Sequence, residues 1–197
     1  MMRLAALVGA TVALAIVADL TPLSDRLFAF HMTQHLLLIA IAAPLLVLGG
    51  LQWQKRPALA WSLFVGVFLL WHWPPLFQWA ARQGWTALEL VTILGTAWLF
   101  WSVALGKSAL NYGARALFVV TASVVTDLPG VVMLFAPHAF CTMPSENAAA
   151  FGLTPLQDQQ IAGLLMWVPA NLAFFGIATA LFAQWLRASH PSSAVSS

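Results

Sequence analysis

The stretch LFAFHMTQHLLLIAIAAPLLVL, residues 27–48, decides the fold class, because it is apolar almost throughout and contains no Asp, Glu, Lys or Arg. About 20 such residues in a helix cross the hydrocarbon core of a bilayer. Similar stretches lie at roughly 4–20, 58–73, 84–105, 115–136 and 160–186. We therefore predict an all-α protein, a polytopic transmembrane helix bundle of about six spans.

The composition of the whole chain supports this prediction. Of its 197 residues, 61% are hydrophobic and only 7% are charged, and the mean hydropathy is +0.87. A soluble domain of this length cannot bury so much apolar surface, and the apolar runs lack the alternation of a membrane barrel. The pI of about 9.2 rests on scattered charges without a basic patch, so we expect no nucleic-acid partner.

The chain shows no internal repeat and no second domain. We predict one transmembrane helical domain over residues 1–188 and a disordered cytoplasmic tail at 189–197, which is rich in small and polar residues. Residues 1–19 have the pattern of a secretory signal, with Arg3 before an apolar stretch. We interpret this segment as a retained first helix.

The positions of the basic residues predict the orientation. If the N-terminus is inside, the outer connections contain only Arg26 and Arg82. The inner side then holds Arg3, Lys55, Arg56, Lys107, Arg115 and Arg187. The positive-inside rule therefore places both termini in the cytoplasm. Four of the five histidines, Cys141 and the methionines beyond the N-terminus then gather in the outer half of the bundle.

Three histidines are the first candidates for a metal site. His31 and His35 are spaced i, i+4, so they project from one face of a helix and can share a metal. Hydrogen bonds to neighbouring helices are the structural alternative, although polar groups within a membrane are usually functional. His72, in WHWPP at 71–75, is expected at a similar depth, either as a third ligand or as an interfacial residue between tryptophans.

Softer potential metal ligands are predicted in the same outer half of the bundle. His138, Cys141 and Met143 place an imidazole, a thiol and a thioether in one outer loop, and Met133 and Met166 add thioethers on helices. Such ligands select Cu(I), and we predict metal contact by Cys141 and Met143. The single cysteine excludes a cysteine-only cluster. Packing in an apolar core is the alternative role of each methionine.

Three acidic residues complete the candidate site. Asp127 precedes Pro129 deep in a span, where it must be neutral, paired or beside a polar cavity. Glu89 and Asp158 are candidates to hydrogen-bond metal-binding histidines from behind, although Asp158 has an alternative role as a helix cap. We find no nucleotide loop, catalytic triad or carboxylate pair, so we predict that the protein is not an enzyme.

Four segments together resemble one known family. They are HMTQHLLL at 31–38, APLLVLG at 43–49, WHWP at 71–74 and DQQIAGLLMWVP at 158–169. In sequence and order they are similar to the CtaG family of cytochrome c oxidase assembly factors, the polytopic membrane family first associated with caa-type oxidases. The segments lie in or beside the predicted spans at 27–48, 58–73 and 160–186.

The resemblance implies a role in maturing a haem-copper oxidase, with copper, as Cu(I), handled at the outer, periplasmic face. It implies a bacterial inner (plasma) membrane, with oxidase subunits, a periplasmic copper chaperone and membrane lipid as partners. The family's histidines correspond to His31, His35 and His72, and its Asp-Gln-Gln to residues 158–160. The chain departs from the pattern at 85–90, where Glu89 is kept but the expected imidazoles are missing, and it is shorter than the usual seven-span member.

Two other functions remain open at this point. An accessory structural subunit of a respiratory complex would bind no metal, and small residues such as Gly9, Ala10 and Gly176 would permit close helix packing. A haem-binding membrane protein would use two histidines on facing helices, for example His31 or His35 opposite His72.

Overall fold

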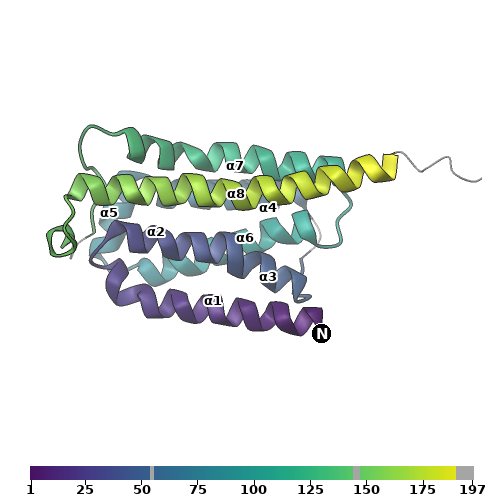
Figure 1. Ribbon diagram of the computed structural model, residues 1–197, viewed down its shortest axis with the longest axis horizontal. Coiled ribbons are helices and arrows are strands. Elements are labelled where there is room, and N and C mark those ends of the chain that lie inside the picture. The colour runs from purple at the N-terminus through teal and green to yellow at the C-terminus, as the bar shows by residue number, and fades with distance from the viewer. Residues whose placement is uncertain (54–55, 144–146, 190–197) are drawn as a thin grey trace, which may run out of the picture.

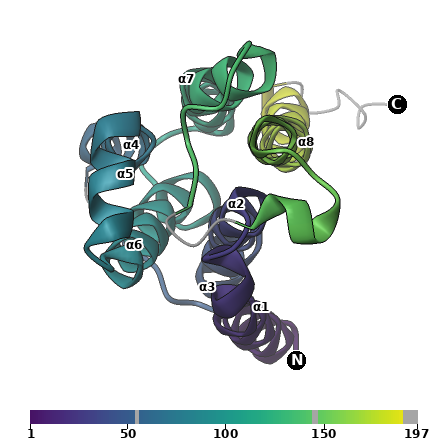
Figure 2. The same ribbon diagram turned by 90° about the vertical axis from the view of Figure 1, so that its left-hand side faces the viewer.

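The computed structural model describes residues 1–53, 56–143 and 147–189, and every regular element in these ranges is helical (Figure 1). The elements are α1 (Met2–Ser24), α2 (Phe28–Leu36), the π-helix η1 (Leu37–Ala42), α3 (Ala43–Leu48), α4 (Pro57–Trp71), α5 (Pro74–Arg82), α6 (Thr86–Leu105), α7 (Tyr112–Phe135), the 3-10 helix η2 (Ala148–Phe151) and α8 (Pro155–Ser189). Seen down the bundle, α2 lies between α6 and α8 (Figure 2). The all-α prediction is confirmed.

The number of spans also agrees with the prediction. Five helical stretches are long and apolar enough to cross a membrane, namely α1, residues 28–48, α6, α7 and α8. The sixth is a bent pair, because α4 has only 15 residues and α5 follows it at an angle of 71°. A plain connection was expected after Trp73, but Pro74 and Pro75 instead open α5, where the first turn needs no backbone N–H.

The span of residues 28–48 is not a uniform α-helix, because the π-helix η1 separates α2 from α3. Pro44 has no backbone N–H, so it cannot donate a hydrogen bond to a carbonyl in the preceding turn. Ile39 O instead accepts a 2.7 Å hydrogen bond from the indole Nε1 of Trp101 on α6. Both the wider turn and the indole therefore compensate for the proline, and they fix α2 and α3 against α6.

The helices α7 and α8 approach each other most closely at two glycines. A Cβ atom at Gly163 would lie 2.6 Å from the carbonyl oxygen of Gly130, and one at Gly130 would lie 3.1 Å from Gly163 O. Neither position has room for a side chain, so the small residues permit direct contact of the two backbones. This contact fixes the position of α8 along α7, and therefore the height in the bundle of the residues in the first two turns of α8.

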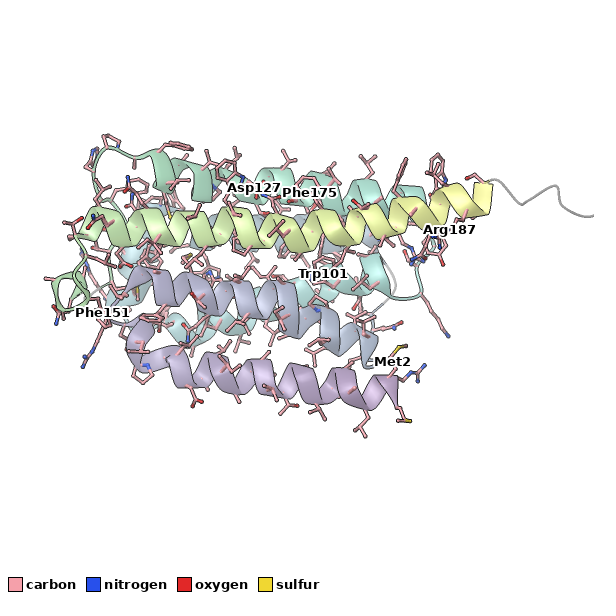
Figure 3. All side chains as sticks on the ribbon, viewed as in Figure 1. Met2, Trp101, Asp127, Phe151, Phe175 and Arg187 are labelled. Carbon is pink, nitrogen blue, oxygen red and sulfur yellow. The ribbon has the colours of Figure 1, made fainter. Side chains whose placement is uncertain are left out.

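The two ends of the bundle differ in charge as the sequence predicted. Met2 and Arg187 lie at one end and Phe151 at the other (Figure 3). Arg3, Arg56, Lys107 and Arg115 are on helix ends or connections of the first end, whereas Arg26 and Arg82 are at the second. The assignment of the first end to the cytoplasm stays a prediction. Lys55 and residues 190–197, the tail beyond Ser189, lie outside the described residues.

Replacing Trp101 by Phe tests the role of the indole. The variant leaves Ile39 O without its donor in a buried, lipid-embedded position, so we expect a loss of about 1–3 kcal/mol in the free energy of unfolding. Titration with SDS, followed by circular dichroism, measures this loss. Trp98→Phe is the matched control, because Trp98 Nε1 donates 2.8 Å to Leu51 O at an exposed position where solvent can replace it. Equal losses in the two variants would contradict the prediction.

Candidate metal centre

Three buried donor groups meet between α2 and α6. The Nε2 atoms of His31 and His35 each lie 3.2 Å from Oε1 of Glu89. The three residues are 0%, 2% and 3% exposed, respectively. One ligand atom from each lies within 4.8 Å of the other two, and no other group of three such residues occurs in the described part of the chain. The donors are therefore close enough to share one metal ion.

The helix α2 brings the two histidines together as their spacing predicted. Their ring centroids are 4.6 Å apart, as expected for side chains one turn apart on the same face. The start of α2 is held by Asp158 on α8, whose carboxylate accepts hydrogen bonds from the backbone N–H groups of Phe28 (2.7 Å) and Ala29 (3.0 Å). Asp158 is thus a cap of α2 rather than of its own helix, and it fixes the height of the histidine pair against α8.

His72 lies beside this cluster, at the bend between α4 and α5. Its ring makes a T-shaped contact with His35, with the centroids 5.3 Å apart, and stacks on Phe68 at 4.0 Å. Its Nδ1 lies 2.7 Å from the carbonyl oxygen of Phe68. Since a carbonyl can only accept, Nδ1 carries the hydrogen and Nε2 has a free lone pair. A backbone carbonyl behind the ring is the usual arrangement of a metal-binding histidine.

Several of these ring nitrogens have no hydrogen-bond partner although they are buried. They are Nδ1 of His31, both nitrogens of His35 and Nε2 of His72. His35 Nε2 is near the Glu89 carboxylate but is not aligned for a hydrogen bond. Unpaired polar atoms are costly in a lipid-embedded interior, and ligation of a cation would compensate for them. Imidazole and carboxylate donors therefore fit a transition-metal ion at this position.

The carboxylate of Glu89 is a further reason to expect a cation at this position. Both ion pairs found among the described residues end at its Oε1, and both involve a histidine rather than Lys or Arg. An ionised carboxylate within a membrane requires a positive partner. For an ionised Glu89, this partner would be a protonated His31 or His35 or a bound cation. The sequence suggested Glu89 only as a support behind the histidines, whereas the structure places it among the donor atoms.

Neither Cys141 nor His138 is among the three residues whose donor atoms converge in the described part of the chain. Cys141 and Met143 are buried in the apolar core, and His138 is exposed. The backbone N–H groups of Phe140 and Cys141 donate to Oε1 of Gln159, which holds the loop on α8. Burial raises the pKa of the Cys141 thiol to about 12. Metal contact by Cys141 and Met143 remains a prediction.

Asp127 belongs to a separate polar group between α7 and α8 (Figure 3). Its carboxylate accepts a 2.9 Å hydrogen bond from Nδ2 of Asn171, whose Oδ1 accepts a 2.6 Å hydrogen bond from Ser123 Oγ. Of the alternatives that the sequence left open for Asp127, the structure shows a hydrogen-bond partner, which is an amide rather than a histidine. Asn171 was not singled out in the sequence, although it is a polar residue in an apolar helix.

The buried state of Cys141 predicts slow chemical modification. With a pKa of about 12, about one thiol in 10⁴ is ionised at pH 8, against about a tenth for an ordinary cysteine. We expect N-ethylmaleimide to label the native protein slowly and the SDS-unfolded protein quickly. A His138→Cys, Cys141→Ser variant is the control, since position 138 is exposed and should react at once. Equal rates for the native wild type and this variant would contradict the prediction.

Comparison with known proteins gives one family. The model of the cytochrome c oxidase caa3 assembly factor family matches residues 50–188. The match begins after the span of His31 and His35, and it includes His72, Glu89 and Asp158. No curated protein and no solved structure matches the chain. Because the family model covers more than half of the sequence, the chain belongs to the cytochrome c oxidase caa3 assembly factor family.

Proposed function

We propose that this membrane protein serves cytochrome c oxidase assembly by holding copper and passing it on. The observation that supports the proposal is the group of unpaired imidazole nitrogens around Glu89, inside helices that can span a membrane. Membership in the family is the basis for the role in oxidase assembly, and the imidazole and carboxylate donors are the basis for proposing copper as the bound metal. No catalytic function is needed for this task.

The charge of the cluster favours a monovalent cargo. Cu(I) beside the Glu89 carboxylate makes a neutral unit, which a lipid-embedded bundle tolerates far better than a net charge. Zinc or Cu(II) at the same donors would leave one uncompensated positive charge. Two imidazoles and one carboxylate oxygen, with His72 next to His35, also leave the coordination incomplete, as exchange of the metal with a partner requires.

The position of the site suggests where copper enters and leaves. The histidines of α2 lie in the half of the bundle opposite the two termini, and Phe77 of α5 packs on His31 with ring centroids 5.6 Å apart. With the termini in the cytoplasm, this half faces the periplasm of a bacterial inner membrane. The partners would then be a periplasmic copper chaperone and the copper-binding subunits of a haem-copper oxidase.

A haem-binding role has less support from the geometry. The rings of His35 and His72 are in direct contact, and the cavity beside His35 has a volume of about 30 Å³. A porphyrin does not fit between or beside these rings without a rearrangement of α2 and α4. The role of a structural subunit without metal remains the second outcome of the experiments below.

Metal loading tests the proposal directly. After anaerobic Cu(I) loading and competition with a chromophoric chelator, we expect about one equivalent of copper on the wild type. A His31→Ala, His35→Ala double variant should lose at least about tenfold in affinity, because two donors are removed. His138→Ala is the control, since this imidazole is exposed and outside the cluster. Less than about a tenth of an equivalent of bound copper on the wild type, or a Cu(I) affinity of the double variant equal to that of the wild type, would contradict the proposal.

Replacing Glu89 by Gln removes the negative charge of the side chain and keeps its size and shape. Glutamine keeps the volume and one acceptor oxygen, but Cu(I) would then remain as a net positive charge within the membrane. We expect the Cu(I) affinity to fall by roughly tenfold or more. The membranes of cells that carry only this variant should also contain less copper-loaded oxidase, measured as oxidase copper per haem. An unchanged affinity would show that the carboxylate does not compensate the cation.

A further inference from the structure

A second group of potential ligands surrounds a small cavity on the other side of His35. The cavity has a volume of about 30 Å³ and lies between α2, η1, α4, α7 and α8. Met32, His35 and Met166 line it, together with Thr126 and apolar side chains. Met32 and Met166 are 1% and 8% exposed, so both residues are buried, as His35 is.

We propose that this cavity is a Cu(I) site formed by the thioethers of Met32 and Met166 and by the imidazole of His35. Two thioethers and one imidazole are a soft donor set, which favours Cu(I) over zinc, magnesium or Cu(II). His35 Nδ1 is buried without a hydrogen-bond partner, and we assign this nitrogen to the cavity, because Nε2 lies 3.2 Å from Oε1 of Glu89. The methionines come from α2 and α8, so the site forms only when these helices are packed together.

The size of the cavity limits its occupant. About 30 Å³ is sufficient for one water molecule or one metal ion. A water molecule would find few polar partners, because the lining is mainly apolar apart from His35 and Thr126. Thr126 Oγ1 already donates 2.9 Å to the carbonyl of Ala122. A soft cation has better partners there, since thioether sulfur is a weak hydrogen-bond acceptor but a good Cu(I) ligand.

His35 belongs both to the cluster with His31 and Glu89 and to the cavity with Met32 and Met166, so it connects the two proposed copper positions. The position at His31, His35 and Glu89 offers nitrogen and oxygen donors, and the cavity, which His35 also lines, offers sulfur. An ion can therefore move from one position to the other by exchanging ligands around His35. In the cavity the thioethers and the imidazole are neutral, so the nearby Glu89 carboxylate remains the group that balances the charge of Cu(I). This inference rests on the proposed copper function and adds to it a deeper position that is selective for Cu(I).

The test uses X-ray absorption at the copper edge on the full-length protein loaded with Cu(I). We expect copper–sulfur scattering in the wild type and its loss in a Met32→Leu, Met166→Leu double variant, with a fall of roughly tenfold in Cu(I) affinity. Zn(II) binding at the nitrogen and oxygen donors should not change. Leucine has a volume close to that of methionine, so the fold should be retained, and circular dichroism checks it.

Met133→Leu is the matched control. Met133 is 1% exposed and lies on α7, but it does not line the cavity. Its replacement should leave the sulfur scattering and the affinity unchanged. Selenomethionine protein gives an independent readout, because copper–selenium scattering should disappear in the double variant and persist in the control.

The outcomes separate this inference from the proposed function. Bound copper with nitrogen and oxygen scattering alone, or sulfur scattering that survives in the double variant, would overturn the cavity site and leave copper handling intact. A protein that binds no Cu(I) would overturn both. If the control loses as much affinity as the double variant, the methionines act through packing and the cavity site is wrong.

Discussion

A helix inside a bilayer has no solvent to complete its hydrogen bonds, and this constraint shapes the protein from its fold to its candidate site. Asp158 supplies acceptors to the first free N–H groups of α2, and Trp101 supplies a donor to Ile39 O. Gln159 does the same for the loop that holds Cys141. Among the described residues, the buried side-chain atoms without a hydrogen-bond partner are four imidazole nitrogens of His31, His35 and His72 and one amide oxygen, Gln34 Oε1, so the exceptions gather near Glu89.

These exceptions are the physical reason for placing a metal there. Buried polar atoms without partners persist where they serve a function, since their cost must be offset when a ligand binds. Glu89 supplies the carboxylate of the site, and α2 sets the positions of His31 and His35 relative to each other. Asp158 fixes the start of α2, and so the height of the two histidines against α8. Membership in the cytochrome c oxidase caa3 assembly factor family is compatible with the copper role that we propose for this site.

Hydropathy and helical periodicity predicted the spans and the shared face of His31 and His35, because both depend on residues close together in the chain. The partners across helices were harder to predict. Asp158 caps a helix that begins 130 residues earlier, and periodicity does not give the rotation of one helix about its axis relative to another. For the same reason Glu89 was expected behind the histidines instead of among them. The helix α5 was missed because two adjacent prolines usually signal an end, whereas here they begin a helix.

The π-helix between α2 and α3 has a consequence for the divergence of such proteins. A π-turn is equivalent to one inserted residue in an α-helix, and each residue turns the helix by about 100°. Deletion of a single residue from 37–42 would return this segment to the α-helical register, apart from the hydrogen bond that Pro44 cannot donate, but it would swing His31 and His35 away from α6 while α3 kept its packing. The length of this short segment, rather than its composition, is therefore under constraint, and a homologue without the extra residue would have to place its ligands on a different face.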